Sequence, residues 1–423
     1  MLSNLPEDLL TEVLVRLSAE SLWKLRRVSK SWRALIESKS FEKLHLIRGQ
    51  SSPSQPDRAL KLMFHGDGIG PIGSVHGFDD SSYVVAEFDS LAKLESTKVQ
   101  IRLPCIRLRG RKCYTGQLRG SRNGLICVSY ESFSPDGHEL GVVLWNPSIN
   151  SYWRLRDSPV SLDWNPENHT DVVTSYGFGY DEIRDDYKLG VSHEEPFLIR
   201  SVMPWGSHRS GVQVNHALHW ILFEDGCDDE KVIVAFDLRT DKFHLVPLPP
   251  SCAQSSEDNW ELGVLDGCLS FTRKSGERSS SCLWIMKEYG AKDSWTRFNF
   301  ENESGCDSPC AGWGCITFGY TCEWSGNAGR KLFFIERCDY CDVKSYTQSV
   351  DEVDEEEDWK TKDKKKPFVI RTDICGRGCL YEGYIFSDSL VRPWSSRGVT
   401  QKRIPLVRRG YKFAPEDQEE ESD

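Results

Sequence analysis

Leu5-Pro-Glu-Asp-Leu-Leu-Thr-Glu-Val-Leu14 is the stretch that decides how this chain of 423 residues begins to fold. Pro6 suits the first turn of a helix, where its missing N–H costs nothing. Glu7 and Asp8 are favourable near the positive end of a helix dipole. Apolar residues recur at three-to-four spacing from this stretch onward: Leu5, Leu9, Leu10, Val13, Leu14 and Leu17. The pattern predicts an amphipathic helix.

Two more short helices are predicted before residue 48. Ser18 suits the N-cap of the second, a third is expected over residues 32–38, and residues 41–46 close the module. Their apolar positions are Leu22, Trp23, Leu25, Val28, Trp32, Leu35, Ile36, Phe41, Leu44 and Leu46. Three short helices bury little apolar surface by themselves, and no cysteine precedes Cys105. We therefore expect a partner protein to complete this module.

Residues 5–46 resemble an F-box, through the segments 5–14, 25–32 and 41–46. The resemblance implies that residues 1–48 bind the small Skp-type adaptor of a cullin–RING ubiquitin ligase. The residues that match the family pattern, and that should contact the adaptor or support the helices that do, are Leu5, Pro6, Leu9, Leu10, Val13, Leu14, Leu25, Val28, Ser29 and Trp32. The alternative is that these leucines form only a local core.

After a predicted linker at residues 49–60, short alternating apolar runs separated by Gly, Asn, Asp and Pro indicate an all-β fold. A turn followed by a strand recurs at residues 123–128, 215–220, 266–271 and 313–318. A hairpin pattern recurs at residues 144–153, 234–243 and 283–295, and residues 178–187 are a candidate for a further copy. The spacing of about 46–51 residues is typical of a four-stranded propeller blade, and another all-β array is the alternative.

Pieces of residues 120–300 also resemble, in order, the F-box-associated interaction domain of plants. The matching pieces are residues 120–125, 144–147, 178–181, 185–188, 214–220, 235–238, 262–265 and 284–289. The resemblance implies a β domain over residues 61–413, built as a kelch-like β-propeller of about six blades. Beyond about residue 320 no family pattern is found. The charged run at residues 351–366 predicts a solvated loop within this domain, and residues 414–423 predict a disordered acidic tail.

The net charge of −11 is concentrated in two places. The tail at residues 414–423 carries −6, and the run at residues 351–366 carries −3, whereas the module at residues 1–48 carries +3. No basic face stands out, so nucleic acid is not an expected partner. No apolar run approaches about 18 residues and no signal peptide is recognised, so we expect no membrane partner and a cytoplasmic or nuclear location.

Motifs for catalysis are weak in this sequence. Residues 68–73 satisfy Gly-x-Gly-x-x-Gly, but Pro71 removes an N–H and no helix pattern follows, so a loop is favoured over a phosphate site. Zinc is the stronger alternative, because eight thiols cluster late in the chain: Cys306, Cys310, Cys315, Cys322, Cys338, Cys341, Cys375 and Cys379. Reduced core thiols are the simpler interpretation, and we expect neither a metal nor another cofactor.

These observations predict a non-catalytic, substrate-recognition subunit of an Skp–cullin–F-box ubiquitin ligase, with an unidentified target protein on the β domain. One alternative is a propeller that binds protein or carbohydrate without the ligase, with tryptophans that stack on a sugar: Trp145, Trp153, Trp164 and Trp205. A zinc-dependent enzyme in the C-terminal half is a third hypothesis.

Overall fold

The structure is a computed structural model of the whole chain. It describes residues 6–51, 61–66, 82–87, 99–102, 112–134, 137–155, 174–193, 210–223, 231–250, 259–265, 267–274, 281–300, 316–320, 331–338, 341–349, 368–371, 380–393 and 399–403. These residues divide between two compact units. The first contains the N-terminal helices, strands β1–β7 and strands β18–β22, and the second contains β8–β17 and β23.

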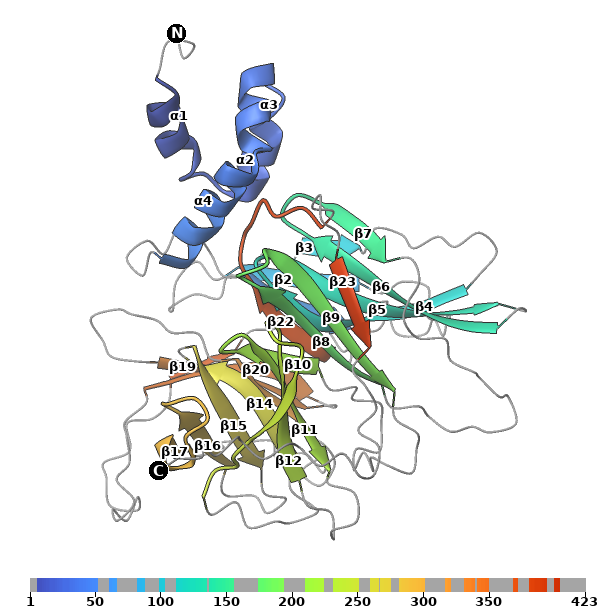
Figure 1. Ribbon diagram of the computed structural model, residues 1–423, viewed down its shortest axis with the longest axis vertical. Helices are drawn as coiled ribbons and strands as arrows, with labels where there is room; N and C mark the ends of the chain where they lie inside the picture. Colours follow the sequence, from blue (N-terminus) through green and yellow to red (C-terminus); the bar gives the residue numbers. More distant parts are fainter. Residues whose placement is uncertain are drawn as a thin grey trace, which may run out of the picture. The chain divides into compact units, whose positions relative to one another are not determined.

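Four helices form the N-terminal module (Figure 1): α1 (Glu7–Leu14), α2 (Ala19–Leu25), α3 (Lys30–Ile36) and α4 (Lys39–Ser51). The predicted N-cap at Ser18 is confirmed, since its hydroxyl accepts a hydrogen bond from the Ser21 N–H at 3.3 Å. Ser29 caps α3 in the same way, accepting from the Trp32 N–H at 3.1 Å. None of the described helices is long and apolar enough to cross a membrane.

Helix α4 is the element that the sequence did not predict. Phe41 and His45 are buried on it, whereas Leu44 and Ile47 are exposed, so its apolar residues face in two directions and give no single stripe. The helix continues to Ser51, three residues into the range 49–60 that was predicted as a linker. The buried ring of His45 lies 3.0 Å from the Leu17 carbonyl through Nε2, which ties α4 to the connection between α1 and α2.

The core of the module contains residues from the helices and two from much later in the chain. Its buried members are Leu14, Val15, Ala19, Leu22, Ile36, Phe41, Ile149 and Leu390. Ile149 lies in the turn after β6, and Leu390 follows β22. The helical module therefore packs against the β part of the first unit.

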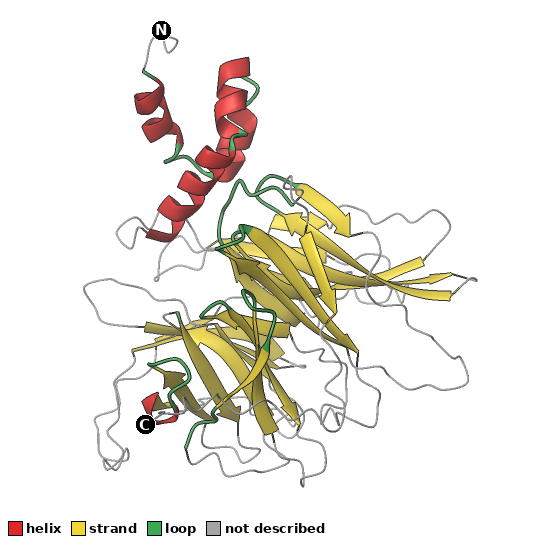
Figure 2. Cartoon of the chain, in the orientation of Figure 1, coloured by secondary structure: helices red, strands yellow, loops and turns green. Residues whose placement is uncertain are grey.

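Every described strand belongs to one of five sheets (Figure 2). The first unit has three four-stranded sheets with the orders β22-β1-β2-β3, β4-β5-β6-β7 and β18-β19-β20-β21. The bounds are β1 (Lys61–Gly66), β2 (Ser82–Glu87), β3 (Val99–Arg102), β4 (Lys112–Arg122), β5 (Leu125–Ser134), β6 (Gly137–Asn146), β7 (Ser151–Leu155), β18 (Ile316–Tyr320), β19 (Lys331–Cys338), β20 (Cys341–Ser349), β21 (Phe368–Arg371) and β22 (Leu380–Phe386).

The second unit has a seven-stranded sheet, β13-β12-β11-β10-β8-β9-β23, and a four-stranded sheet, β14-β15-β16-β17. The bounds are β8 (Thr174–Asp181), β9 (Asp186–His193), β10 (Ser210–Val214), β11 (Ala217–Phe223), β12 (Lys231–Asp237), β13 (Phe243–Val246), β14 (Asn259–Leu265), β15 (Cys268–Lys274), β16 (Ser281–Met286), the 3-10 turn η2 (Lys292–Ser294), β17 (Trp295–Phe300) and β23 (Val399–Arg403). In the seven-stranded sheet, a short parallel pairing of β8 with β10 joins the antiparallel strands β10–β13 to the antiparallel hairpin β8–β9, and β23 pairs in parallel with β9.

The repeated turns predicted from sequence occupy equivalent places. Asn123 and Gly124 join β4 to β5 with φ of 53° and 78°, and Asn215 and His216 join β10 to β11 with φ of 45° and 61°. Gly267, with φ of 74°, precedes β15. Two-residue turns with positive φ match the right-handed twist of antiparallel strands, which is why Asn and Gly recur there. The fourth predicted turn, at residue 313, lies outside the described residues.

The predicted hairpins also recur, since residues 144–153, 234–243 and 283–295 correspond to the pairs β6–β7, β12–β13 and β16–β17. Each pair joins the third and fourth strands of an antiparallel group. The prediction of a small helical module followed by an all-β array is confirmed. The count of about six blades stays a prediction, and the predicted loop at residues 351–366 and tail at residues 414–423 lie outside the described residues.

Candidate docking surface

The predicted site residues of the helical module divide into three groups. Leu9, Val13 and Val28 are 54%, 57% and 62% exposed, and Pro6 is also exposed. Leu10, Leu25, Ser29 and Trp32 are partly buried, and Leu14 is fully buried. Leu5 lies outside the described residues. The exposed group is available to a partner, whereas Leu14 belongs to the core that holds the helices together.

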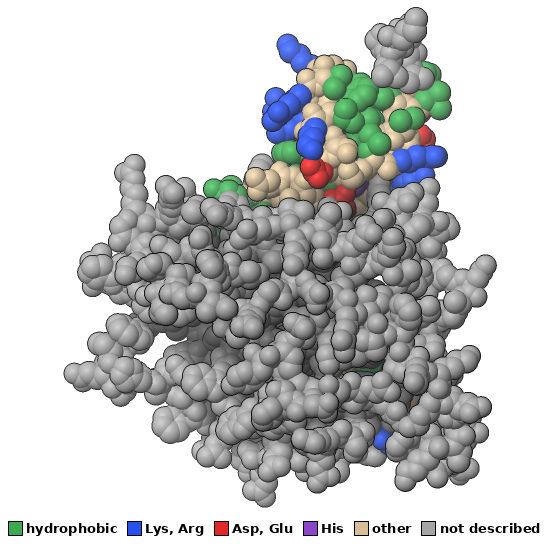
Figure 3. Space-filling model, turned by 180° about the vertical axis from the view of Figure 1, so that it is seen from behind, with side chains coloured by type: hydrophobic (Ala, Val, Ile, Leu, Met, Phe, Trp, Pro, Cys, Tyr) green, Lys and Arg blue, Asp and Glu red, His purple; other side chains and the backbone are tan. Residues whose placement is uncertain are grey.

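The exposed apolar side chains need a physical explanation. Leu9 and Val13 lie four residues apart on α1, so they share one face of that helix, and Val28 lies in the connection between α2 and α3. Hydrophobic side chains gather over one face of the helical module, with Lys and Arg beside them (Figure 3). A contiguous apolar area rimmed by charge is typical of a protein-docking surface.

Three of the partly buried residues support the helices. Leu10, Leu25 and Trp32 all pack against the core that contains Leu14 and Leu22. Ser29 accepts the Trp32 N–H as the N-cap of α3, and its hydroxyl lies 2.9 Å from that of Ser31. These positions therefore support the helices, which the prediction included as one of their two roles, and contact of any of the ten residues with an adaptor stays a prediction.

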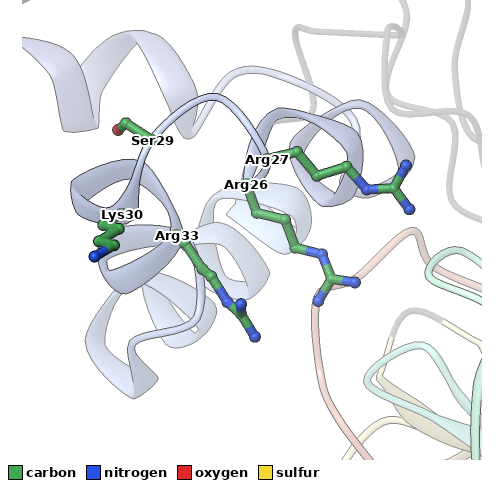
Figure 4. A pocket seen from close by; sticks show the side chains of 5 residues that line it. All are labelled: Arg26, Arg27, Ser29, Lys30 and Arg33. Atoms are coloured by element: carbon green, nitrogen blue, oxygen red, sulfur yellow. The ribbon is translucent and has the colours of Figure 1, made fainter.

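A basic hollow beside this surface was missed by the sequence analysis. It encloses about 510 Å³ and is lined by Arg26, Arg27, Ser29, Lys30 and Arg33 (Figure 4). The sequence contains a signal for it, four cations in close succession at residues 26, 27, 30 and 33, but the net charge of +3 over residues 1–48 hides this local concentration. The hollow lies at the connection between α2 and α3, and its lining residues come before and after Val28 in the sequence.

The charges around the hollow are unevenly compensated. Glu37 pairs with both Arg26 and Arg33, at 3.1 Å in each case. The guanidinium of Arg26 also stacks 3.5 Å from the ring centroid of Trp23, which holds it in place. Among the described residues, no carboxylate lies within ion-pairing distance of the exposed Arg27 or Lys30. The hollow therefore presents the uncompensated positive charge of Arg27 and Lys30, which suits an acidic partner.

A buried ionic cluster in the second unit contains Asp181 and Lys188, the charged residues that end the matching pieces 178–181 and 185–188. Asp181, at the end of β8, is fully buried, with Oδ2 3.2 Å from Arg184 and 3.6 Å from Lys188 on β9. Lys188 Nζ also lies 2.9 Å from Asp241 and donates to the Leu238 carbonyl. These contacts tie the β8–β9 hairpin to the β12–β13 turn, so the cluster has a structural role.

The chemical alternatives gain no support from the described residues. No group of three metal-ligating side chains occurs among them. Cys338 and Cys341 are paired in register across the β19–β20 hairpin, and the other six residues of the proposed zinc cluster lie outside the described ranges. Cys127 is buried, and burial raises the pKa of its thiol to about 12, which keeps it protonated. The motif at residues 68–73 also lies outside.

The tryptophans considered for sugar stacking do not form a group. Trp145 is fully buried in the first unit, whereas Trp153 on β7 is half exposed. Trp164 and Trp205 lie outside the described residues. The structure thus brings no two of them together at one described surface, and the helical module offers the best-defined site.

Comparisons with known proteins agree with this picture. Residues 2–44 match the F-box domain, and residues 196–309 match the F-box associated beta propeller domain. The chain is 27% identical to the F-box/kelch-repeat protein At3g23880 of Arabidopsis thaliana, over 70% of this chain and 78% of that protein. It is 28% identical to the F-box protein CPR1 of Arabidopsis thaliana, over 70% of this chain and 72% of that protein.

Among solved structures, the GH43_1 enzyme from Xanthomonas citri in complex with xylotriose aligns with a TM-score of 0.31 and 13% identity. The alignment covers 66% of this chain and 78% of that chain. A likeness of this size is too weak to support any argument about fold or activity.

Proposed function

Because this chain is a plant F-box protein with an F-box-associated β-propeller domain, we propose that it is a substrate receptor of an Skp–cullin–F-box ubiquitin ligase. The helical module, hereafter the F-box, binds the Skp-type adaptor and through it the cullin. The β domain holds a target protein. The complex works in the cytoplasm or the nucleus.

The observation that carries this proposal is the exposure of Leu9, Val13 and Val28 in a module whose core is formed by other apolar residues. Burying a side chain of this size stabilises a complex by roughly 1.5–3 kcal/mol. Three such residues on so small a module are costly unless a partner covers them. An adaptor surface of matching apolar character would do so.

The basic hollow deepens the proposal by naming the charge of the adaptor surface. It begins at Arg26 and Arg27, immediately before Val28, so a protein that covers Val28 also approaches the hollow. We expect acidic side chains of the adaptor to enter it. Such charges steer association and fix the orientation of the partner more than they add affinity.

The proposed mechanism is proximity. The receptor holds the target near the ubiquitin-charged enzyme, and this raises the effective concentration of the target lysines. The chain contributes binding and orientation, and the chemistry of ubiquitin transfer belongs to other subunits.

The test is recovery of the Skp-type adaptor and the cullin with the purified full-length chain. The double variant Leu9→Asp and Val13→Asp should lose the adaptor, because it would place two charges in an apolar interface. The matched control is Ile183→Asp, since Ile183 is 73% exposed in a turn of the second unit. Adaptor recovery that is equal for the double variant and the wild type would refute the proposed docking surface.

A further inference from the structure

The segment at residues 387–393, hereafter the strap, follows β22 and touches both the F-box and the sheets of the first unit. The direct covalent connection from α4 to β1 runs through residues 52–60. A connection through one segment alone leaves the orientation of a small module open to rotation. The strap adds a second attachment, from residues far along the sequence, through hydrogen bonds, an ion pair and one apolar contact.

The strap is held firmly on its β side. The side-chain amide of Asn146, at the end of β6, donates to the Ser389 carbonyl at 2.9 Å and to the Val391 carbonyl at 2.8 Å. Asn146 and Ser389 are both fully buried. Gly124, in the β4–β5 turn, lies so close that a Cβ there would be 2.6 Å from the Ser387 carbonyl. Burial and satisfied hydrogen bonds fix the path of the strap on this sheet.

On its other side the strap contacts the start of α2. The Asp388 carboxylate accepts the Ala19 N–H through Oδ2 at 2.6 Å, and both residues are buried. The first N–H groups of a helix have no partner within the helix, so Asp388 satisfies one of them.

The strap also contacts the end of α3 and the start of α4. Arg392 donates through Nη2 to the Glu37 carbonyl at 2.8 Å, and Glu37 is the C-cap of α3. The Nε of Arg392 lies 3.7 Å from the Glu42 carboxylate in the first turn of α4. Between these polar anchors, Leu390 is 2% exposed within the F-box core. The strap thus contacts α2 through Ala19, the end of α3 through Glu37 and α4 through Glu42, and these contacts together hold the F-box in one orientation.

We propose that the strap locks the F-box onto the β sheets of the first unit, so that Asp388, Leu390 and Arg392 are positioning residues for ubiquitin transfer. This consequence rests on the proposed ligase function, whereas the lock itself does not. A fixed F-box sets which lysines near the receptor come within range of the charged enzyme, because proximity is effective only with a defined geometry.

The lock is tested by a distance distribution between two spin labels on the full-length chain. Both labels are attached to an encoded keto amino acid, at the exposed Ala34 of α3 and the exposed Tyr152 of β7, because fifteen cysteines preclude labelling of a single thiol. The test variant is Asp388→Ala with Arg392→Ala. The matched control is Glu20→Ala with Lys24→Ala, which removes an exposed ion pair of 2.6 Å from α2.

We expect one narrow distribution for the wild type and the control, and a distribution about twofold wider or more for the strap variant. Unchanged width in the strap variant would overturn the proposal. Arg392→Ala alone serves if the double variant does not fold, because it keeps the buried bond between Asp388 and Ala19. Amide exchange of α1–α3 verifies that the F-box itself is folded in each variant.

Adaptor recovery separates the two proposals. If the wild type fails to recover the adaptor, the ligase function fails, and the label distances still decide the lock. If it recovers the adaptor, we expect the strap variant to recover it equally, since Leu9, Val13 and Val28 are unchanged. Mass spectrometry of self-ubiquitinated lysines should then show a broader set of sites in the strap variant, and an identical set would refute the positioning role.

Discussion

The hydroxyl of Tyr289 lies 2.7 Å from Nε2 of His219, and this contact joins two sheets of the second unit. His219 is fully buried on β11, and its Nδ1 lies 3.1 Å from the Val212 carbonyl. A carbonyl only accepts, so Nδ1 carries the proton and the neutral ring accepts at Nε2 from the Tyr289 hydroxyl. His244 also approaches this hydroxyl, at 3.2 Å.

Acid should destabilise the second unit through His219. Burial lowers the pKa of His219 to about 4 from its ordinary 6.5, whereas the pKa of Tyr289 rises to about 12, so Tyr289 stays neutral. Between these two histidine values the unfolded chain binds a proton that the folded chain does not. The free energy of unfolding should therefore fall by up to about 3 kcal/mol as pH drops from above 6.5 to about 4.

Urea unfolding at pH 7.5 and pH 5 measures this effect. His219→Gln keeps a hydrogen-bonding side chain but cannot titrate, so its urea midpoint should fall less with acid than that of the wild type. His216→Asn is the matched control, because Asn tolerates the positive φ of His216 in the adjacent turn. An equal pH dependence for His219→Gln and the wild type would show that another group is responsible.

Removal of the Lys188 charge alone should lower the free energy of unfolding substantially, because the carboxylate of Asp181 stays buried. Among the described residues, Lys188→Met leaves the buried Asp181 with only the half-exposed Arg184 as an ion-pair partner, and we expect the free energy of unfolding to fall by about 3–5 kcal/mol. Arg184→Met, in the same cluster but half exposed, should cost less than about 1 kcal/mol. Urea unfolding followed by tryptophan fluorescence compares the two, and similar losses would contradict the role of burial.

Two glycines with the same backbone conformation allow the packing of the strap to be measured. Gly124 and Gly267 have φ of 78° and 74°, so either substitution by Ala carries a similar strain of about 1 kcal/mol. A Cβ at Gly267 would meet no atom of the described residues within 4 Å, whereas one at Gly124 would overlap the Ser389 side chain. Gly124→Ala should therefore lower the free energy of unfolding by a further ~1–3 kcal/mol. Equal losses of unfolding free energy in the two variants would mean that the strap moves aside for the added Cβ without cost.

The basic hollow should make adaptor binding sensitive to salt. Arg27→Glu with Lys30→Glu should weaken adaptor affinity about tenfold at low salt and much less at high salt, because screening removes the attraction between the charges. Lys287→Glu with Lys292→Glu makes the same change of charge on exposed residues of the second unit. Calorimetric titration measures both, and a loss that does not depend on salt would argue against an acidic partner in the hollow.

Local features of the fold could be predicted from the sequence. Ser18 and the repeated Asn and Gly turns act through the backbone of their own neighbours, so their residue types suffice to identify them. Helix α4 was missed because its apolar residues form no single buried stripe, since Phe41 is buried and Leu44 is exposed. Sequence patterns of short range did not separate the exposed Leu9 from the buried Leu14 on α1. Which leucine is buried depends on the other helices and on Leu390, which pack against Leu14 in one core.

Contacts between distant segments could not be predicted. Nothing in the sequence around Leu390 links it to Leu14, although both are buried in one core. Asn146 is another case, since its residue type suits a turn, but its amide is engaged by backbone carbonyls of the distant strap. Long-range packing of this kind is a property of the assembled fold.

The strap also affects the order in which the protein can mature during synthesis. Ala19 and its partner Asp388 are separated by 369 residues, which a ribosome adds in roughly 20–70 seconds at about 5–20 residues per second. The F-box emerges first but lacks Leu390, Asp388 and Arg392 for all of that time. A nascent or truncated chain therefore carries a helical module that has not yet been fixed on the sheets of the first unit, and this attachment forms only once residues 388–392 have been made.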